Sequence, residues 1–134
     1  EALKLGASAV QMGTAFLTVD ECAIHPIYKS AICSDDSDST KITRAFSGGA
    51  ARGLANQFMR DNENSDLLPF PYHISVTKPF RKIANQKGEI EYTNLWCGQS
   101  GKLARKMTVR DLVTNLVVET KSAGVDLVKS NSRN

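Results

Sequence analysis

The sequence has few cysteines, and their spacing matches no metal or redox motif. There are three cysteines, an odd number, at Cys22, Cys33 and Cys97, and no two of them form a CxxC motif. This spacing argues against a disulfide framework and against a zinc site, so we expect reduced thiols in a cytoplasmic protein. No base adjoins any of the three in the sequence, and a structural role is therefore expected for each.

Long apolar runs and a strong excess of charge are also missing. No stretch is long enough to cross a bilayer, and the net charge of the 134 residues is only +3. Lys102, Arg105, Lys106 and Arg110 form a local basic stretch, but no aromatic residues are interleaved with them. We interpret this stretch as a solvated helix face, and expect neither nucleic acid nor a membrane as a partner.

The acidic segment over residues 34–40 lacks the features of a calcium loop. Asp35, Asp36 and Asp38 have a superficially similar spacing, but the glycine and the final glutamate of an EF-hand are absent. We therefore interpret the segment as a solvated loop and expect no metal site. What remains is a globular composition with 41% hydrophobic residues, of the length of one ordinary domain.

The first residues read as half of a βαβ unit. Residues 1–5 have the pattern of the last turns of a helix, which Gly6 would close in a left-handed conformation. Residues 9–12 are a mainly apolar run typical of a strand buried on both faces of a parallel sheet, and Gly13 follows it. Such a strand needs neighbours that this chain does not supply, so we expect an α/β fragment that does not fold alone.

The remaining pattern is mostly helical. We expect strand structure over 40–47, ended by Gly48-Gly49, and a loop over 61–72. Helices are expected over 20–33, 52–60, 74–86 with a bend or restart at Pro79, 92–106, and from Thr108 onward. Thr108 and Asp111 have the spacing of an N-terminal capping box. The last helix would bury Leu112, Leu116, Val117 and Leu127, and residues 129–134 would form a polar tail.

The most informative motif is Gln-Met-Gly-Thr at residues 11–14. A glycine directly after a buried strand lets the backbone approach a ligand, and its N–H groups can point at a phosphate. Thr14 adds a hydroxyl donor and Gln11 a side-chain amide. An ordinary strand-to-helix turn has the same residue types, so this motif alone leaves both interpretations open.

Four ordered stretches give the motif its context. They are EALKLGASAVQMGTAFL at 1–17, the stretch from 18 to 29 that contains HPIYK, TRAFSGGAARGLAN at 43–56, and YTNLWCGQ at 92–99. Together they resemble nitronate monooxygenases, formerly called 2-nitropropane dioxygenases, over residues 1–122.

This resemblance implies the C-terminal fragment of an FMN-dependent TIM (β/α)8 barrel. Residues 1–17 would be the last barrel strand with its phosphate loop, and 18–134 a mainly helical extension. The whole enzyme would oxidise alkyl nitronates with O₂ to carbonyl compounds and nitrite. Gln11, Met12, Gly13 and Thr14 would bind the FMN phosphate.

The chain also departs from the family. Ser47-Gly48-Gly49 stands where relatives often have Ser-Gly-Arg, so residue 49 receives no role. The family's catalytic histidine and the contacts to the flavin ring precede Glu1, and no catalytic residue is expected in this segment. His25 and His73 have no paired carboxylate or nucleophile nearby, and we interpret them as caps or partly buried polar residues.

Tyr92, Trp96 and Gln99 are the candidates for the substrate pocket. If residues 92–106 are helical, these side chains share one face, which could close over a flavin or simply pack against the barrel. Lys102 is interpreted as a surface residue. Two other functions stay open from the sequence: an FMN-dependent enoyl-acyl-carrier-protein reductase that uses NAD(P)H, and a non-catalytic interaction module.

Overall fold

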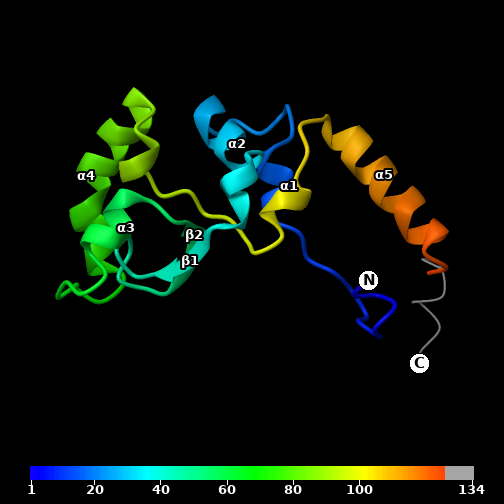
Figure 1. Cartoon of the computed structure of the whole chain (residues 1–134), viewed down its shortest axis with the longest axis horizontal. Helices are drawn as coiled ribbons and strands as arrows, with labels where there is room; N and C mark the ends of the chain where they lie inside the picture. Colours follow the sequence, from blue (N-terminus) through cyan, green and yellow to red (C-terminus); the bar gives the residue numbers. More distant parts are fainter. Residues whose placement is uncertain (126–134) are drawn as a thin grey trace.

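The computed structural model describes residues 1–125, so the expectations for Leu127 and for residues 129–134 lie outside the described part. The described chain is a mixed α/β arrangement, which confirms the predicted class in this coarse form. Its elements are α1 (Thr14–Leu17), α2 (Pro26–Ile32), the 3₁₀ turn η1 (Asp35–Asp38), β1 (Thr40–Thr43), β2 (Ala51–Leu54), α3 (Gln57–Asp61), α4 (Tyr72–Lys87), the 3₁₀ turns η2 (Ile90–Tyr92) and η3 (Gly101–Leu103), and α5 (Val109–Ser122). Figure 1 shows α3, α4 and the two strands at one end, α5 at the other, and α1 and α2 between them.

The two strands form an antiparallel hairpin in which Thr40 pairs with Leu54. Strand structure was predicted for β1, but the helix predicted over 52–60 is wrong in its first half, because residues 51–54 are extended and the helix begins only at Gln57. Contacts with the segment around Leu95 decide this outcome. Leu54 N–H donates to Leu95 O at 2.9 Å, and a Cβ at Gly53 would lie 2.7 Å from that same carbonyl oxygen.

Residues 92–106 do not form the predicted helix. They form the end of η2, an extended segment and η3. Besides the pairing of Leu95 with Leu54, the N–H of Cys97 donates to Arg52 O at 3.2 Å. The segment therefore runs along β2 as an irregular third strand. These long-range hydrogen bonds determine its conformation, although the local spacing of its residues is that of a helix.

The two longest helices follow their local signals. Pro79 lies inside α4, which ends at Gly88 in the left-handed conformation with φ +70°. Thr108 caps α5: its hydroxyl oxygen accepts from Asp111 N–H at 3.1 Å, and its hydroxyl donates to the Asp111 carboxylate at 2.8 Å. The helix predicted over 74–86 is confirmed, although α4 continues past Pro79 and does not restart there. The predicted N-cap at Thr108 is also confirmed, but the Asp111 carboxylate bonds the Thr108 hydroxyl rather than the Thr108 N–H that a capping box requires.

At the N-terminal end the elements differ from expectation. Residues 1–5 form turns rather than a helix, although Gly6 has the predicted positive φ. Residues 9–12 form no strand within the described chain, and Val10 and Met12 are 47% and 42% exposed. No described strand lies beside these residues to accept and donate ladder hydrogen bonds, as expected from the sequence, so their burial between neighbouring strands stays a prediction.

The core is small and lies where α2, β2 and the extended segment meet. Ile32, Leu54, Leu95 and Cys97 form its buried cluster. On the α4 side, the Phe46 ring stacks at 4.8 Å on the ring of Phe58, which contacts Phe80 at the same distance. No helix within residues 1–125 is both long and apolar enough to span a bilayer.

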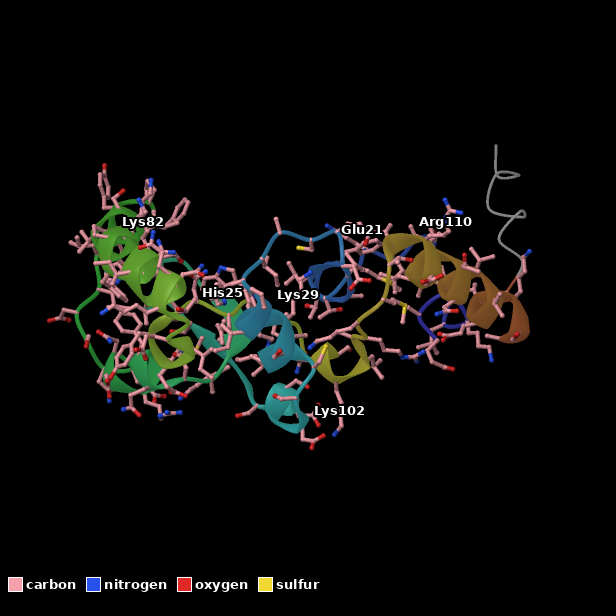
Figure 2. All side chains as sticks on the ribbon, turned by 90° about the horizontal axis from the view of Figure 1, so that it is seen from above. Glu21, His25, Lys29, Lys82, Lys102 and Arg110 are labelled. Atoms are coloured by element: carbon pink, nitrogen blue, oxygen red, sulfur yellow. The ribbon has the colours of Figure 1, made fainter. Side chains whose placement is uncertain are left out.

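Polar contacts join the residues just after α1 to the residues just before α5. Thr18 hydroxyl donates to Arg105 O at 2.9 Å, and Asp20 N–H donates to Met107 O at 3.0 Å. The Glu21 carboxylate accepts from Val109 N–H, the first residue of α5, and Figure 2 shows Glu21 beside this end of the helix. The residues after α1 and the residues before α5 therefore lie side by side, which brings α5 close to residues 11–14.

Candidate functional site

A cavity of about 760 Å³ lies between the N-terminal segment, the end of the extended segment and α5. Its walls include all four residues of the predicted phosphate loop, together with Gln99. The apolar part of the remaining wall comes from both sides: Leu3, Val10, Leu103, Met107, Leu112 and Leu116. Polar and charged residues, among them Arg105, Asn115 and Glu119, also line it. A hollow lined mainly by apolar residues with several polar groups among them is the usual form of a cofactor pocket.

The loop presents its backbone to this cavity. Gly13 precedes α1 and has φ −110°, a conformation open to any residue. A Cβ built on Gly13 meets no atom within 4 Å, so there is open space over the loop. The first N–H groups of a helix have no partner inside the helix, which leaves the N–H groups of Gly13 and Thr14 available to a bound anion.

The Thr14 hydroxyl has one hydrogen-bond partner. Its oxygen accepts from the N–H of Gly98 at 3.0 Å, across a sequence separation of 84 residues. This contact brings the end of the extended segment, and with it Gln99, to the edge of the loop. Gly98 was not predicted as a site residue, although it lies inside the family-like stretch YTNLWCGQ that pointed to its neighbours.

The other two pocket candidates lie elsewhere. Trp96 packs edge-on against the Phe46 ring at 5.7 Å and pairs with Gly53, so it belongs to the packing around β2. Tyr92 ends η2 and is 43% exposed. Neither lines the cavity that holds Gln99. The predicted common face fails because the intervening backbone is extended, so residues four apart do not share a face.

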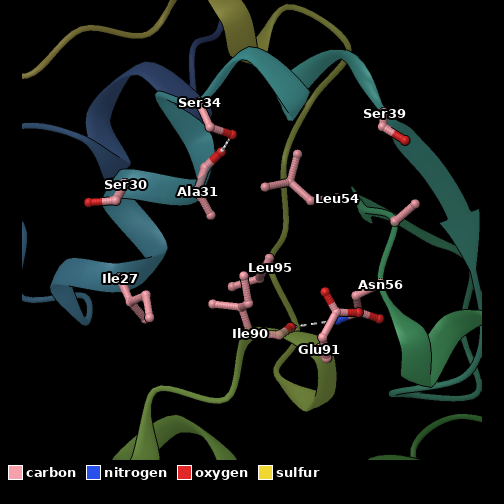
Figure 3. A pocket seen from close by; sticks show the side chains of 11 residues that line it. Ile27, Ser30, Ala31, Ser34, Ser39, Leu54, Asn56, Ile90, Glu91 and Leu95 are labelled. Atoms are coloured by element: carbon pink, nitrogen blue, oxygen red, sulfur yellow. Dashed lines mark hydrogen bonds between the residues drawn. The ribbon is translucent and has the colours of Figure 1, made fainter.

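A second cavity of about 440 Å³ lies between α2, the end of β2 and η2 (Figure 3). Asn56 and Glu91 supply polar side chains there, and both are already used by the fold. Asn56 donates to Ile90 O at 3.0 Å, and Glu91 accepts from Gln57 N–H at the start of α3 at 2.7 Å. Because both side chains are already hydrogen-bonded within the fold, we interpret this cavity as a gap between packed elements.

The two histidines have structural positions. His25 is the N-cap of α2, where its Nδ1 accepts from Ile27 N–H at 3.3 Å, in agreement with its interpretation as a cap. His73 is partly buried, and its Nε2 lies 2.8 Å from Ala45 O. Lys102 forms an exposed ion pair with Asp38 at 2.6 Å, and the hydrogen bond that its ammonium donates to this carboxylate raises the pKa of Lys102.

The cysteines differ in burial. Cys97 is 2% exposed and Cys33 is exposed. Burial raises the pKa of the Cys97 thiol, which keeps it protonated and unreactive. Among residues 1–125, no three His, Cys, Asp or Glu side chains gather as they would around a metal ion.

Comparison with known proteins decides the family. A sequence model described as "Nitronate monooxygenase" matches residues 1–119. The chain belongs to the nitronate monooxygenase family. It is 42% identical to a probable nitronate monooxygenase from Staphylococcus saprophyticus, over 84% of this chain and 32% of that protein. It is 38% identical to one from Bacillus subtilis, over 88% of this chain and 35% of that protein.

Two solved structures are also similar. Nitroalkane oxidase from Streptomyces ansochromogenes superposes with a TM-score of 0.86 at 36% identity, over 91% of this chain and 35% of that one. FabK from Thermotoga maritima superposes with a TM-score of 0.71 at 30% identity, over 92% and 40%. The chain thus spans about a third of the length of the nitronate monooxygenases it matches. The family is one of flavoenzymes that oxidise nitronates, and the family assignment made from the sequence is confirmed.

Proposed function

We propose that this chain supplies the FMN-phosphate loop and one wall of the substrate pocket for the oxidation of alkyl nitronates by O₂ to carbonyl compounds and nitrite. The observation that carries this proposal is the shared cavity: residues 11–14 and Gln99, which are far apart in the sequence, line one hollow of about 760 Å³.

The residues present suit a phosphate group. The loop offers the N–H groups of Gly13 and Thr14 and the Thr14 hydroxyl, all hydrogen-bond donors, and the space over Gly13 is clear. Backbone N–H groups and hydroxyls aimed at a phosphate form charge-assisted hydrogen bonds. FMN, when bound, supplies the redox chemistry. The part of this chain is to hold the phosphate, and Gln99, which lines the same cavity, would contribute its amide to the wall of the substrate pocket.

The same proposal accounts for the exposed N-terminal segment. We assign residues 9–12 to the last strand of a (β/α)8 barrel and α5 to a helix on its outside. Val10 and Met12 would then be covered by neighbouring barrel strands, and the phosphate loop would lie at the barrel's C-terminal mouth, where the loops after the last strands commonly bind phosphate. The catalytic base and the contacts to the flavin ring would come from outside this chain.

The test uses a chimaera in which residues 1–119 replace the matching segment of the Streptomyces ansochromogenes nitroalkane oxidase. We expect the purified chimaera to carry FMN, to consume O₂ with propyl nitronate and to release nitrite. Oxidation of NAD(P)H with an enoyl thioester, without nitrite release, would instead favour a reductase. A folded chimaera that binds no flavin would contradict the assignment of a phosphate loop and favour an interaction module.

A further inference from the structure

One hydrogen bond connects the phosphate loop to a distant part of the chain. Among the hydrogen bonds of the described residues, the only one that joins residues 11–14 to a segment far away in sequence runs from Gly98 N–H to Thr14 Oγ1, at 3.0 Å. A hydroxyl has one donor hydrogen and two acceptor positions. Because Gly98 occupies an acceptor position, the hydroxyl hydrogen has to point elsewhere.

Nothing within residues 1–125 accepts that hydrogen. The hydroxyl of Thr14 lines the cavity, and the bond from Gly98 is its one hydrogen bond in the described chain. Because the Gly98 N–H already points at the Thr14 oxygen, a hydroxyl hydrogen turned toward Gly98 would meet the amide hydrogen. The hydroxyl hydrogen is therefore directed away from Gly98, where it can be donated to an anion. The Gly98 N–H therefore sets the hydroxyl as a donor.

Gly98 itself is held firmly from the other side. Tyr28 hydroxyl donates to Trp96 O at 2.7 Å, Cys97 N–H donates to Arg52 O at 3.2 Å, and Gly98 O accepts from Gly101 N–H at 3.0 Å. A Cβ on Gly101 would lie 2.4 Å from the Cys97 sulfur, so the turn after Gly98 is closely packed. The N–H that reaches Thr14 thus belongs to a well-anchored backbone.

We infer that Gly98 is a positioning residue for the flavin phosphate: its N–H orients the Thr14 hydroxyl as a donor and ties the segment that carries Gln99 to the phosphate loop. This inference rests on the proposed function, because it assumes a phosphate at residues 11–14. The coupling is reciprocal. A phosphate that fixes Thr14 also fixes the position of Gln99, so the phosphate end of the cofactor and the substrate wall are joined by one bond.

The test compares FMN with riboflavin, which lacks the phosphate, in the apoprotein of the chimaera. Affinities are measured by the quenching of flavin fluorescence. Gly98→Pro removes the N–H, but its Cδ would stand where the hydrogen points at Thr14 Oγ1. The deciding variant is therefore a backbone ester, with glycolic acid in place of Gly98, which removes the N–H and adds no atom. Gly98→Ala keeps the N–H, and its Cβ would lie 3.5 Å from Thr14 Oγ1, an ordinary contact. Thr14→Val removes the hydroxyl, and Thr14→Ser retains it.

We expect the backbone ester at position 98 to weaken FMN binding by about threefold to tenfold, the scale of one lost hydrogen bond, while riboflavin binding stays unchanged. Gly98→Pro should weaken FMN binding at least as much, because its Cδ also displaces the Thr14 hydroxyl. Gly98→Ala and Thr14→Ser should keep the preference for FMN. Thr14→Val should reduce that preference by about tenfold or more. Combining Gly98→Pro with Thr14→Val should cause no further loss, because both changes act on the same bond.

The outcomes separate this inference from the proposed function. Equal weakening of FMN and riboflavin by Gly98→Pro would show a merely structural role and overturn the inference, as would an unchanged preference. If Thr14→Val still lowered that preference, the proposed function would stand. A wild-type chimaera that binds FMN no better than riboflavin would overturn both. The same outcomes apply to the backbone ester at position 98, and where the two variants differ the ester decides, because it removes the N–H without placing a Cδ against Thr14 Oγ1.

Discussion

Asn56 holds three parts of the chain together, and its replacement should be among the most damaging single changes. It is 2% exposed. Its Oδ1 accepts from Met59 N–H at 3.1 Å and so caps α3. Its Nδ2 donates to Ile90 O at 3.0 Å and to Thr93 O at 2.9 Å, which fixes η2 and the start of the extended segment.

The cost can be estimated bond by bond. Loss of an N-cap side chain costs about 1 kcal/mol, and each of the two hydrogen bonds that Nδ2 donates, to Ile90 O and Thr93 O, contributes about 1 kcal/mol more. Asn56→Ala should therefore lower the free energy of unfolding by about 3 kcal/mol. Asn56→Asp keeps a good cap but brings a carboxylate to two carbonyl oxygens, so it should lose at least about 2 kcal/mol despite its similar shape.

The measurement is urea unfolding of the chimaera followed by circular dichroism. Asn64→Ala is the matched control, because Asn64 is exposed and its side chain makes no hydrogen bond in the described chain; its effect should stay within about 0.5 kcal/mol. An Asn56→Asp variant as stable as the wild type would refute the reasoning, since it would mean that the two donor bonds to residues 90 and 93 contribute nothing.

Three further predictions concern side chains and the isolated chain. Burial raises the pKa of Tyr28 above its ordinary value of 10.0; its contribution to stability should be complete below pH 10 and fall as pH rises further, and Tyr28→Phe should remove this alkaline dependence in unfolding measured against pH. Iodoacetamide should modify the exposed Cys33 well before the buried Cys97, as read by peptide mass spectrometry, and equal rates would contradict the packing of Cys97. The isolated 134 residues should bind ANS, unfold without a sharp transition and leave propyl nitronate unoxidised; a cooperative transition or FMN-dependent O₂ consumption would contradict this.

Local signals in the sequence predict the helices whose ends they define. The N-cap of α5 at Thr108 and the apolar spacing that predicts the helix over 74–86 both depend on residues within one or two turns. The sequence pattern failed where distant backbone groups decide the conformation. Leu54 pairs with Leu95 and Arg52 with Cys97, and these bonds replace the predicted helix with extended chain at 52–54 and in the part of 92–106 around these residues.

The same difference between local signals and distant contacts applies to the candidate site. Residues 11–14 form one contiguous family-like motif, so the sequence could group them, and they line one cavity together with Gln99; their binding of a phosphate stays a prediction. Tyr92 and Trp96 were grouped with Gln99 only through an assumed helical face. Gly98 carries no side chain, so its backbone contact with Thr14 had no signal in residue type.

The most direct test of the phosphate-loop assignment is the flavin content of a Gly13→Val chimaera. The φ of Gly13 suits a side chain, and a Cβ there meets no atom of this chain within 4 Å. The protein should therefore fold, while a bound phosphate would collide with the valine. The absorbance of flavin per protein after gel filtration should fall to near zero in Gly13→Val, and Thr14→Val should be milder, by about 1–3 kcal/mol in FMN affinity. If Gly13→Val retains stoichiometric FMN at wild-type affinity, residues 11–14 are an ordinary turn and the assignment is wrong.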